Sequence, residues 1–360
     1  MSHQHNGIRS LMEVKAKILS IGLVSISDRT AQMSEVQNRK LARLVTKLNL
    51  HAWPWLFLRL NDQIRIRVVV DPTGGSELEL VLSDSGTDLY EVIDRDKGTI
   101  ARVTLEESIY HCPGQFFFAF YTRCVNDCKY CPSPLADPSR RDTIERMIWA
   151  GHSVDITNLK GIGITTAVPG HLTPDDLAEE MAQAVKALRS EWGNELPIGV
   201  SPFPCSRRSI ERLREAGANE IRINSETFDI DLHKIMCPNK DLDQILVSLE
   251  AAVDVFGRNM VSSNIIVGLG ETNDDIIRGV EELCEMGVIP TLYPLDPIPG
   301  RIEQLKRVSD GKAARPSARR LVNLAEIHKE ALDRYRLDPT KLRTMCPACA
   351  ASHLMPGIDL

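Results

Sequence analysis

The chain has 360 residues, of which 43% are hydrophobic and 26% charged, and its formal net charge is −6. These values exclude a disordered chain and allow one large α/β domain with an appendage. The negative charge leaves no electrostatic footprint for nucleic acid or an anionic membrane, and no apolar run is long enough to span a bilayer. We therefore expect a cytoplasmic protein whose nine cysteines serve metal binding or redox chemistry rather than disulfides.

Residues 1–105 are predicted to form a small α+β accessory domain whose role the sequence does not indicate. A short helix is expected at 41–48. Alternating apolar and polar residues, separated by turns, then predict strands in hairpins or a meander. These expected strands lie at 63–71, 78–84, 89–94 and 99–105.

Residues 106–335 repeat a unit of an apolar strand, a loop and an amphipathic helix. One unit places a strand at 161–168 before a helix, with Thr173 as the expected N-cap and Pro174 at the first helical position. Six such units predict a parallel sheet, either doubly wound or a partial barrel. In both folds, active-site residues lie at the carboxyl ends of the strands.

Three cysteines with the spacing Cys124-x3-Cys128-x2-Cys131 follow the first of these strands. A disulfide is disfavoured by the expected compartment, and a zinc ion would need a fourth ligand from elsewhere. A [4Fe–4S] cluster on three thiolates would leave one iron free to bind a substrate or cofactor.

This spacing, with Tyr130 just before the last cysteine, resembles the radical S-adenosylmethionine (SAM) superfamily, and the resemblance covers residues 112–335. It implies a partial (β/α)6 TIM-type barrel. It also implies that Cys124, Cys128 and Cys131 hold a [4Fe–4S] cluster whose open iron binds SAM. Reductive cleavage of SAM would then yield a 5′-deoxyadenosyl radical that abstracts a hydrogen atom.

The resemblance also implies which residues contact SAM. Segment 264–272 resembles the family motif G-x-I-x-G-x-x-E, with Asn264 in place of the first glycine. Period two is expected to place Arg222, Asn224 and Glu226 on one strand face; Glu226 is then a candidate for the ribose hydroxyls, or a member of a buried network with Arg222. The full set of expected SAM contacts is Tyr130, Thr165, Thr166, Asn224, Glu226, Ile266, Gly268, Glu271 and Tyr293.

Within the superfamily, the chain is most similar to the biotin-synthase-like subgroup, which includes biotin synthase, methylornithine synthase and a hydrogenase maturase. Gly199 and Ser262 stand where biotin synthase has cysteines for its second cluster, so biotin synthase itself is disfavoured. Cys284 is expected in the hydrophobic core because it lies at an apolar helix position.

A second cysteine set remains: Cys112 before the first strand, and Cys346 and Cys349 in a tail at residues 336–360. We favour a second [4Fe–4S] cluster on these residues, formed by the tail folding back over the barrel. A structural zinc and an exposed, unligated pair stay open as alternatives. An additional ligand or substrate contact is expected from Cys205, Cys237, Ser352, His353 or Arg222.

A biotin-synthase-like core with an N-terminal extension and a C-terminal cysteine pair resembles the two-protein, archaeal-type lipoyl synthases. The resemblance implies sulfur insertion into an unactivated C–H bond of an octanoyl chain, with the second cluster as sulfur donor. Implied partners are an octanoylated lipoyl carrier protein or peptide, a paralogous radical SAM subunit, and an electron donor such as ferredoxin or flavodoxin. A radical mutase or maturase with a structural second cluster, and a non-enzymatic metal-binding scaffold, remain as alternatives.

Overall fold

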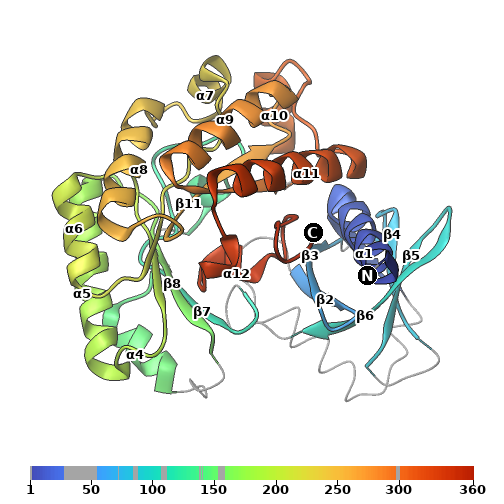
Figure 1. Cartoon of the computed structure of the whole chain (residues 1–360), viewed down its shortest axis with the longest axis horizontal. Coiled ribbons are helices and arrows are strands. Elements are labelled where there is room, and N and C mark those ends of the chain that lie inside the picture. Colours follow the sequence, from blue (N-terminus) through green and yellow to red (C-terminus); the bar gives the residue numbers. More distant parts are fainter. Residues whose placement is uncertain are drawn as a thin grey trace.

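The computed structural model describes residues 2–27, 55–71, 73–83, 88–106, 112–137, 139, 141–152, 159–296 and 301–360 (Figure 1). The helix expected at 41–48 lies outside these residues. No described helix is long and apolar enough to cross a membrane.

The N-terminal part consists of helix α1 (Ser2–Ile21) and a closed six-stranded barrel in the order β1-β3-β2-β6-β5-β4. Strand β1 pairs in parallel with β3 and β4, and the other pairs are antiparallel. Buried and half-buried residues alternate along β3, as expected for a strand with one face in a core. The four predicted strands correspond to β3–β6, whereas β1, β2 and the closure were not predicted. The strands are β1 (Leu23–Ile26), β2 (Trp55–Leu60), β3 (Ile64–Val70), β4 (Leu78–Leu82), β5 (Tyr90–Asp94) and β6 (Gly98–Glu106).

The second part is an α/β structure whose six parallel strands follow one another in chain order without closing. This arrangement agrees with the expected partial barrel rather than a doubly wound sheet, in which the strand order reverses. The strands are β7 (Gln115–Ala119), β8 (Gly161–Thr165), β9 (Ile198–Ser201), β10 (Glu220–Arg222), β11 (Val261–Val267) and β12 (Ile289–Pro294).

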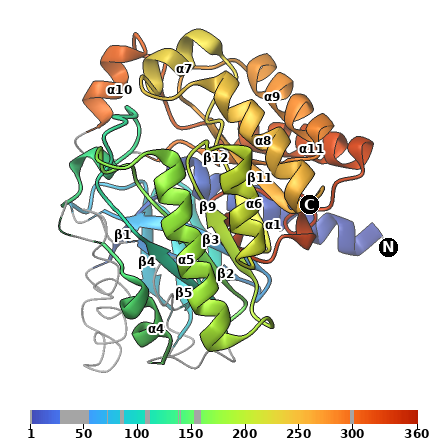
Figure 2. The same cartoon turned by 90° about the vertical axis from the view of Figure 1, so that its left-hand side faces the viewer.

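Helices cover the outer face of this sheet (Figures 1 and 2). One hydrophobic core joins them to the strands, and Cys284 is fully buried in it, as predicted. The helices are α4 (Ile144–His152), α5 (Pro174–Trp192), α6 (Arg207–Glu215), α7 (Ile230–Met236), α8 (Leu242–Phe256), α9 (Asn273–Met286), α10 (Ile302–Val308) and α11 (Ala318–Tyr335).

Helix α5 begins where the sequence predicts. Thr173 is the N-cap and Pro174 occupies the first turn. The Thr173 hydroxyl accepts a hydrogen bond from the Asp176 amide, and the Asp176 carboxylate accepts one from the Thr173 amide. This reciprocal capping satisfies two amides that the helix itself leaves unpaired.

The polar strand face expected at Arg222, Asn224 and Glu226 is wrong in extent. Strand β10 ends at Arg222, and Glu226 has a left-handed φ of 68°. A left-handed residue interrupts the alternation of an extended strand. The side chains of Arg222 and Glu226 therefore reach two different places.

The tail after α11 lies between the parallel sheet and the N-terminal barrel, with the short helix α12 (Met345–Cys349) next to β7 and β8 (Figure 1). The Gln115 side chain, at the start of β7, accepts from the Met345 amide (2.5 Å) and donates to its carbonyl (2.9 Å). The Glu220 carboxylate, at the start of β10, accepts from the Thr344 amide (3.0 Å). These contacts fix the tail at the amino ends of the strands.

Candidate functional site: two groups of cysteines

Cys124, Cys128 and Cys131, here the first cysteine group, lie in the loop after the carboxyl end of β7. The loop is folded on itself by hydrogen bonds from the Cys124 amide to the Ser133 carbonyl (3.3 Å) and from the Cys131 amide to the Cys128 carbonyl (3.0 Å). The Ser133 amide also donates to the Cys131 sulfur (3.4 Å). The backbone thus orients the loop and supplies a donor to one thiol.

A fourth cysteine, Cys237 at the end of α7, joins the first group. Its thiol hydrogen-bonds to Cys128, and this bond, followed by the charge of Lys240, lowers the pKa of Cys128 to about 7 although burial opposes the shift. The Tyr130 hydroxyl lies 3.6 Å from the Cys237 sulfur. Cys237 is therefore placed at the first group and not at the second.

Lys240 and Glu226 form a largely buried ion pair (2.7 Å) beside this group, with 11% and 7% of their side chains exposed. The buried partner of Glu226 is thus Lys240 and not Arg222, as the network interpretation had it. Glu226 also lies next to β11: its amide donates to the Asn264 carbonyl (2.9 Å) and its carbonyl accepts from the Ile266 amide (2.8 Å).

The donor set of the first group fits an iron–sulfur cluster. Cys128 and Cys131 pack with Tyr130, Cys237 and Ile266 in one apolar cluster, which shields soft thiolate ligands from water. No three described His, Cys, Asp or Glu side chains are close enough to hold a single metal ion. A four-iron cluster spreads its ligands more widely than one ion does, so this finding is compatible with a cluster at the loop.

The segment 266–271 approaches the first group through Ile266, but Glu271 is tied to its own loop. Its carboxylate accepts from the Gly268 (2.8 Å) and Gly270 (3.1 Å) amides and pairs with Arg320 (2.9 Å). Gly268 has a φ of 115°, and a Cβ there would collide with the Ala314 carbonyl. The contact of Glu271 with SAM stays a prediction. In the structure, Glu271 stabilises the loop after β11.

The remaining expected SAM contacts divide between the carboxyl ends of the strands and the interior. Thr165 ends β8, and the Thr166 hydroxyl donates to the Ala167 carbonyl (2.9 Å). The Asn224 side-chain oxygen accepts from the Asn264 amide (3.4 Å). Tyr293, by contrast, hydrogen-bonds to Cys346, away from the first group.

Cys112, Cys346 and Cys349, here the second cysteine group, are brought together by the returning tail. Cys112 and Cys349 share a hydrogen bond, which with burial raises the pKa of Cys112 well above its usual value. The same bond lowers the pKa of Cys349. Both pack against Trp55 and Phe57 of β2. All three cysteines are at most 7% exposed, so the pair in the tail is not a surface feature.

Cationic side chains surround the second group. Lys15 pairs with Asp359 (2.8 Å), Arg65 with Glu106 (2.7 Å) and Arg67 with Asp296. The positive charges of Arg65 and Lys15 both help to lower the pKa of the Cys349 thiol. Sequence reasoning missed these side chains. The alternation of Arg65 and Arg67 with buried apolar residues along β3 was the pattern that could have indicated them.

Arg222 differs from these cations. Its guanidinium donates to the Cys346 sulfur (2.9 Å) and to the Ser201 hydroxyl (3.3 Å), and it forms no ion pair with a carboxylate among the described residues. The residue is only 7% exposed. An arginine stays charged and a buried charge needs a partner, and among the described residues the sulfur of Cys346 lies nearest to this guanidinium as a hydrogen-bond acceptor.

The other expected ligands are placed as follows. His353 is fully buried, its ring lies 5.0 Å from that of Tyr293, and neither ring nitrogen has a partner in the described structure. Ser352 precedes it and is half-buried. Cys205 belongs to neither group: its carbonyl accepts from Ser248, and burial raises the pKa of its thiol to about 12.

Comparison with known proteins agrees with this geometry. Residues 118–283 match the family described as the radical SAM superfamily. The lipoyl synthase of Ectopseudomonas mendocina is 23% identical over 214 residues, which cover 56% of this chain and 60% of that protein. The lipoyl synthase of Caldicellulosiruptor bescii is 23% identical over 63% of this chain and 75% of that protein.

Two further similarities are more distant or shorter. A bacteriochlorophyllide c C-7(1)-hydroxylase of Chlorobaculum limnaeum is 32% identical over 132 residues, 35% of this chain and 33% of that protein. The crystal structure of methylornithine synthase is 19% identical, with a TM-score of 0.48 over 61% of each chain. Several of these relatives are thus matched over less than two thirds of their length. Residues 118–283, slightly less than half of this chain, thus match the radical SAM superfamily, and a longer part of the chain is similar to lipoyl synthases.

Proposed function

We propose that the protein is a radical SAM enzyme that inserts sulfur into an unactivated C–H bond of an octanoyl chain, in the synthesis of the lipoyl cofactor. The observation that carries this proposal is the second cysteine group, buried and facing a cation, Arg222, that has no carboxylate partner within the described parts of the chain. The similarity to lipoyl synthases supports the same chemistry.

In this proposal the first cysteine group holds the [4Fe–4S] cluster and Glu226, Ile266 and the loop after β11 border SAM. A cluster held by these residues would supply the electron for reductive cleavage of SAM, and SAM would supply the radical that abstracts hydrogen. The chain's own residues prepare the site: Lys240 offsets the negative charge of the thiolates and of Glu226, and the Ser133 amide donates to Cys131. The apolar cluster around Cys128 excludes water.

The second cysteine group would hold a second [4Fe–4S] cluster that serves as sulfur donor. Its three soft thiolates and its cationic surroundings fit an anionic cluster better than they fit neutral thiols. The Arg222 and Tyr293 side chains contact Cys346 and would orient it. His353, which is buried, lies near Tyr293 and has no hydrogen-bond partner for either ring nitrogen among the described residues, is our candidate for a further ligand.

The two groups lie at different levels of the partial barrel. The first follows the carboxyl end of β7, whereas the tail enters beside the amino ends of β7 and β10. Arg222 and Glu226, four residues apart, reach the second and the first group respectively. An extended acyl chain between them would present one carbon to the radical and to the sulfur donor in turn.

The proposed partners follow from this chemistry. An octanoylated lipoyl carrier protein or peptide would be the substrate, ferredoxin or flavodoxin the electron donor, and a paralogous radical SAM subunit would add the other sulfur.

The test is anaerobic reconstitution with an octanoylated carrier peptide, SAM and reductant, followed by mass spectrometry. We expect 5′-deoxyadenosine together with a thiolated octanoyl peptide. Formation of 5′-deoxyadenosine with a rearranged or hydroxylated product would instead contradict sulfur insertion. Absence of SAM cleavage with a fully loaded first cluster would contradict the enzymatic proposal as a whole.

A further inference from the structure

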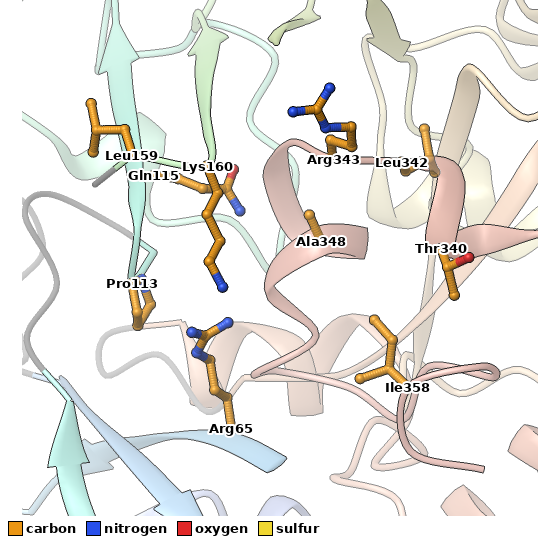
Figure 3. A pocket seen from close by; sticks show the side chains of 10 residues that line it. All are labelled: Arg65, Pro113, Gln115, Leu159, Lys160, Thr340, Leu342, Arg343, Ala348 and Ile358. Atoms are coloured by element: carbon orange, nitrogen blue, oxygen red, sulfur yellow. The ribbon is translucent and has the colours of Figure 1, made fainter. Parts of the chain in front are cut away.

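A pocket of about 420 Å³ opens at the amino ends of the strands, between the parallel sheet, the tail and β3 (Figure 3). Its lining comes from parts of the chain that are far apart in sequence, so only the folded protein forms it. The lining residues are Arg65, Pro113, Gln115, Leu159, Lys160, Thr340, Leu342, Arg343, Ala348 and Ile358.

The lining is basic on one side and apolar on the other. Arg65, Lys160 and Arg343 contribute positive charge, and none of the ten lining residues is acidic. Arg65 already pairs with Glu106, whereas Lys160 and Arg343 are exposed and form no ion pair among the described residues. Figure 3 shows the ends of Arg65 and Lys160 pointing toward one another across the pocket. Two like charges that approach in this way favour an anion between them.

The pocket adjoins the second cysteine group through the backbone. Pro113 directly follows Cys112, and Ala348 directly precedes Cys349. Gln115, another lining residue, holds the tail through its two bonds to Met345. The pocket is therefore the solvent-facing neighbour of the second group, at the opposite end of the strands from the first group.

We propose that this pocket binds a small organic anion, carrying a carboxylate or phosphate and a short apolar portion. The cations would hold the charged group, and Leu159, Leu342 and Ile358 would contact the apolar portion. Its role rests on the proposed function: a ligand bound here would lie beside Cys112 and Cys349, away from the SAM site, and would shield the second group from solvent without itself carrying sulfur. Binding itself does not depend on that function.

Calorimetric titration of the full-length, anaerobically purified protein tests the proposal, with citrate in one arm and inorganic phosphate in the other. We expect at least one anion to bind, and Lys160→Ala and Arg343→Ala each to weaken it about fivefold or more, as the loss of a charge-assisted hydrogen bond would. Lys341→Ala, which removes the same charge between two lining residues, is the matched control and should change affinity less than twofold. The stronger arm distinguishes carboxylate from phosphate.

A second readout uses thiol reagents of similar size on the metal-free full-length chain. We expect the ratio of labelling by anionic iodoacetate to labelling by neutral iodoacetamide to be higher at Cys349 than at Cys124, and to fall several-fold in Lys160→Ala and Arg343→Ala. Peptide mass spectrometry measures both sites in one sample. No binding in either arm, or affinities and ratios equal in the pocket variants and in Lys341→Ala, would overturn the proposal. Neither assay contains SAM or substrate, so failure here is distinct from failure of sulfur insertion.

Discussion

The two cysteine groups are built in opposite ways. Residues 124–131 form the first from a single loop, with the pair of Lys240 and Glu226 beside it. The second is assembled from three places: the segment before β7, the C-terminal tail, and the cations that α1, β3 and β10 direct toward it. The geometry of a site within one loop depends mainly on that loop, whereas the geometry of a site assembled from distant segments depends on the whole fold.

This comparison gives the N-terminal part a role that its sequence alone did not suggest. Strand β2 packs Trp55 and Phe57 against Cys112 and Cys349, and the β3 amide of Arg67 donates to the Ala351 carbonyl (2.8 Å). The barrel is therefore one wall of the second cysteine group. If the two groups are built independently, a substitution at one group should leave the other largely intact, and the following variants test this.

The largest effect is expected at the first group. Cys128→Ala should lower the rate of 5′-deoxyadenosine formation by about a thousandfold or more, because the proposed cluster would lose one of its three expected thiolate ligands. Chromatographic assay of 5′-deoxyadenosine measures it. Cys284→Ala, which alters a core cysteine remote from both groups, is the control and should keep most of the rate. Equal rates in the two variants would remove the first group from the chemistry.

The next largest effect is expected on stability. Lys15 and Asp359 are both fully buried, and the Lys15 ammonium also donates to the Ala350 carbonyl (2.6 Å). Lys15→Met should lower the free energy of unfolding by about 3–5 kcal/mol, because it leaves a buried carboxylate without its partner. The double variant with Asp359→Asn should recover much of this loss. Denaturant unfolding measures both.

Lys17→Met is the matched control for Lys15→Met. Lys17 lies on the same helix and pairs with Asp94 (3.3 Å), but 31% of its side chain is exposed. Its partner Asp94 is buried but also accepts a hydrogen bond from the Asp96 amide (3.1 Å), so loss of this partly exposed pair should cost less, about 1–2 kcal/mol. If both variants cost the same, the buried pair does not fasten the tail.

A smaller, more selective effect is expected at Arg222. Arg222→Met should reduce the iron bound by the second group, since the anionic site loses its unshared cation, while 5′-deoxyadenosine formation stays within about threefold of the unaltered protein. Arg222→Lys, which keeps the charge, should retain more iron. Iron analysis and Mössbauer spectra provide the measurements. Unchanged iron in Arg222→Met would refute the charge argument.

The smallest effect is expected at Gly199. A Cβ at this position would collide with the Thr344 side chain of the tail. Gly199→Ala should destabilise the protein by about 1–3 kcal/mol through this overpacking and should loosen the second group before the first. Gly75→Ala, at a site without a left-handed φ where the nearest atom to a Cβ would be the Thr73 hydroxyl at 3.4 Å, separates the collision from a general glycine effect. Thermal unfolding and the iron content of each variant test this.

The sequence predicted whatever is local. The spacing of Cys124, Cys128 and Cys131, the cap at Thr173 and the succession of six strands all depend on neighbours in the chain. The structure confirms the cap and the strand order. The sequence also grouped Cys112 with Cys346 and Cys349, on the expectation that the tail folds back over the barrel.

What the sequence could not predict depends on long-range contacts. The closed N-terminal barrel requires β1 to pair with strands that come much later. The early end of β10 depends on a left-handed residue, Glu226, which no periodicity reveals. The placement of Cys237 against Cys128, and of Tyr293 against Cys346, follows from how loops pack after folding.

The central claim is that one cysteine group generates the radical and the other supplies the sulfur. The most direct measurement compares the unaltered protein with the double variant Cys346→Ser and Cys349→Ser, both reconstituted anaerobically and supplied with SAM, reductant and octanoylated peptide. We expect iron to fall from about eight to about four per chain, 5′-deoxyadenosine to persist, and the thiolated product to vanish. Iron near four in both proteins, or a thiolated product from the double variant, would contradict the claim.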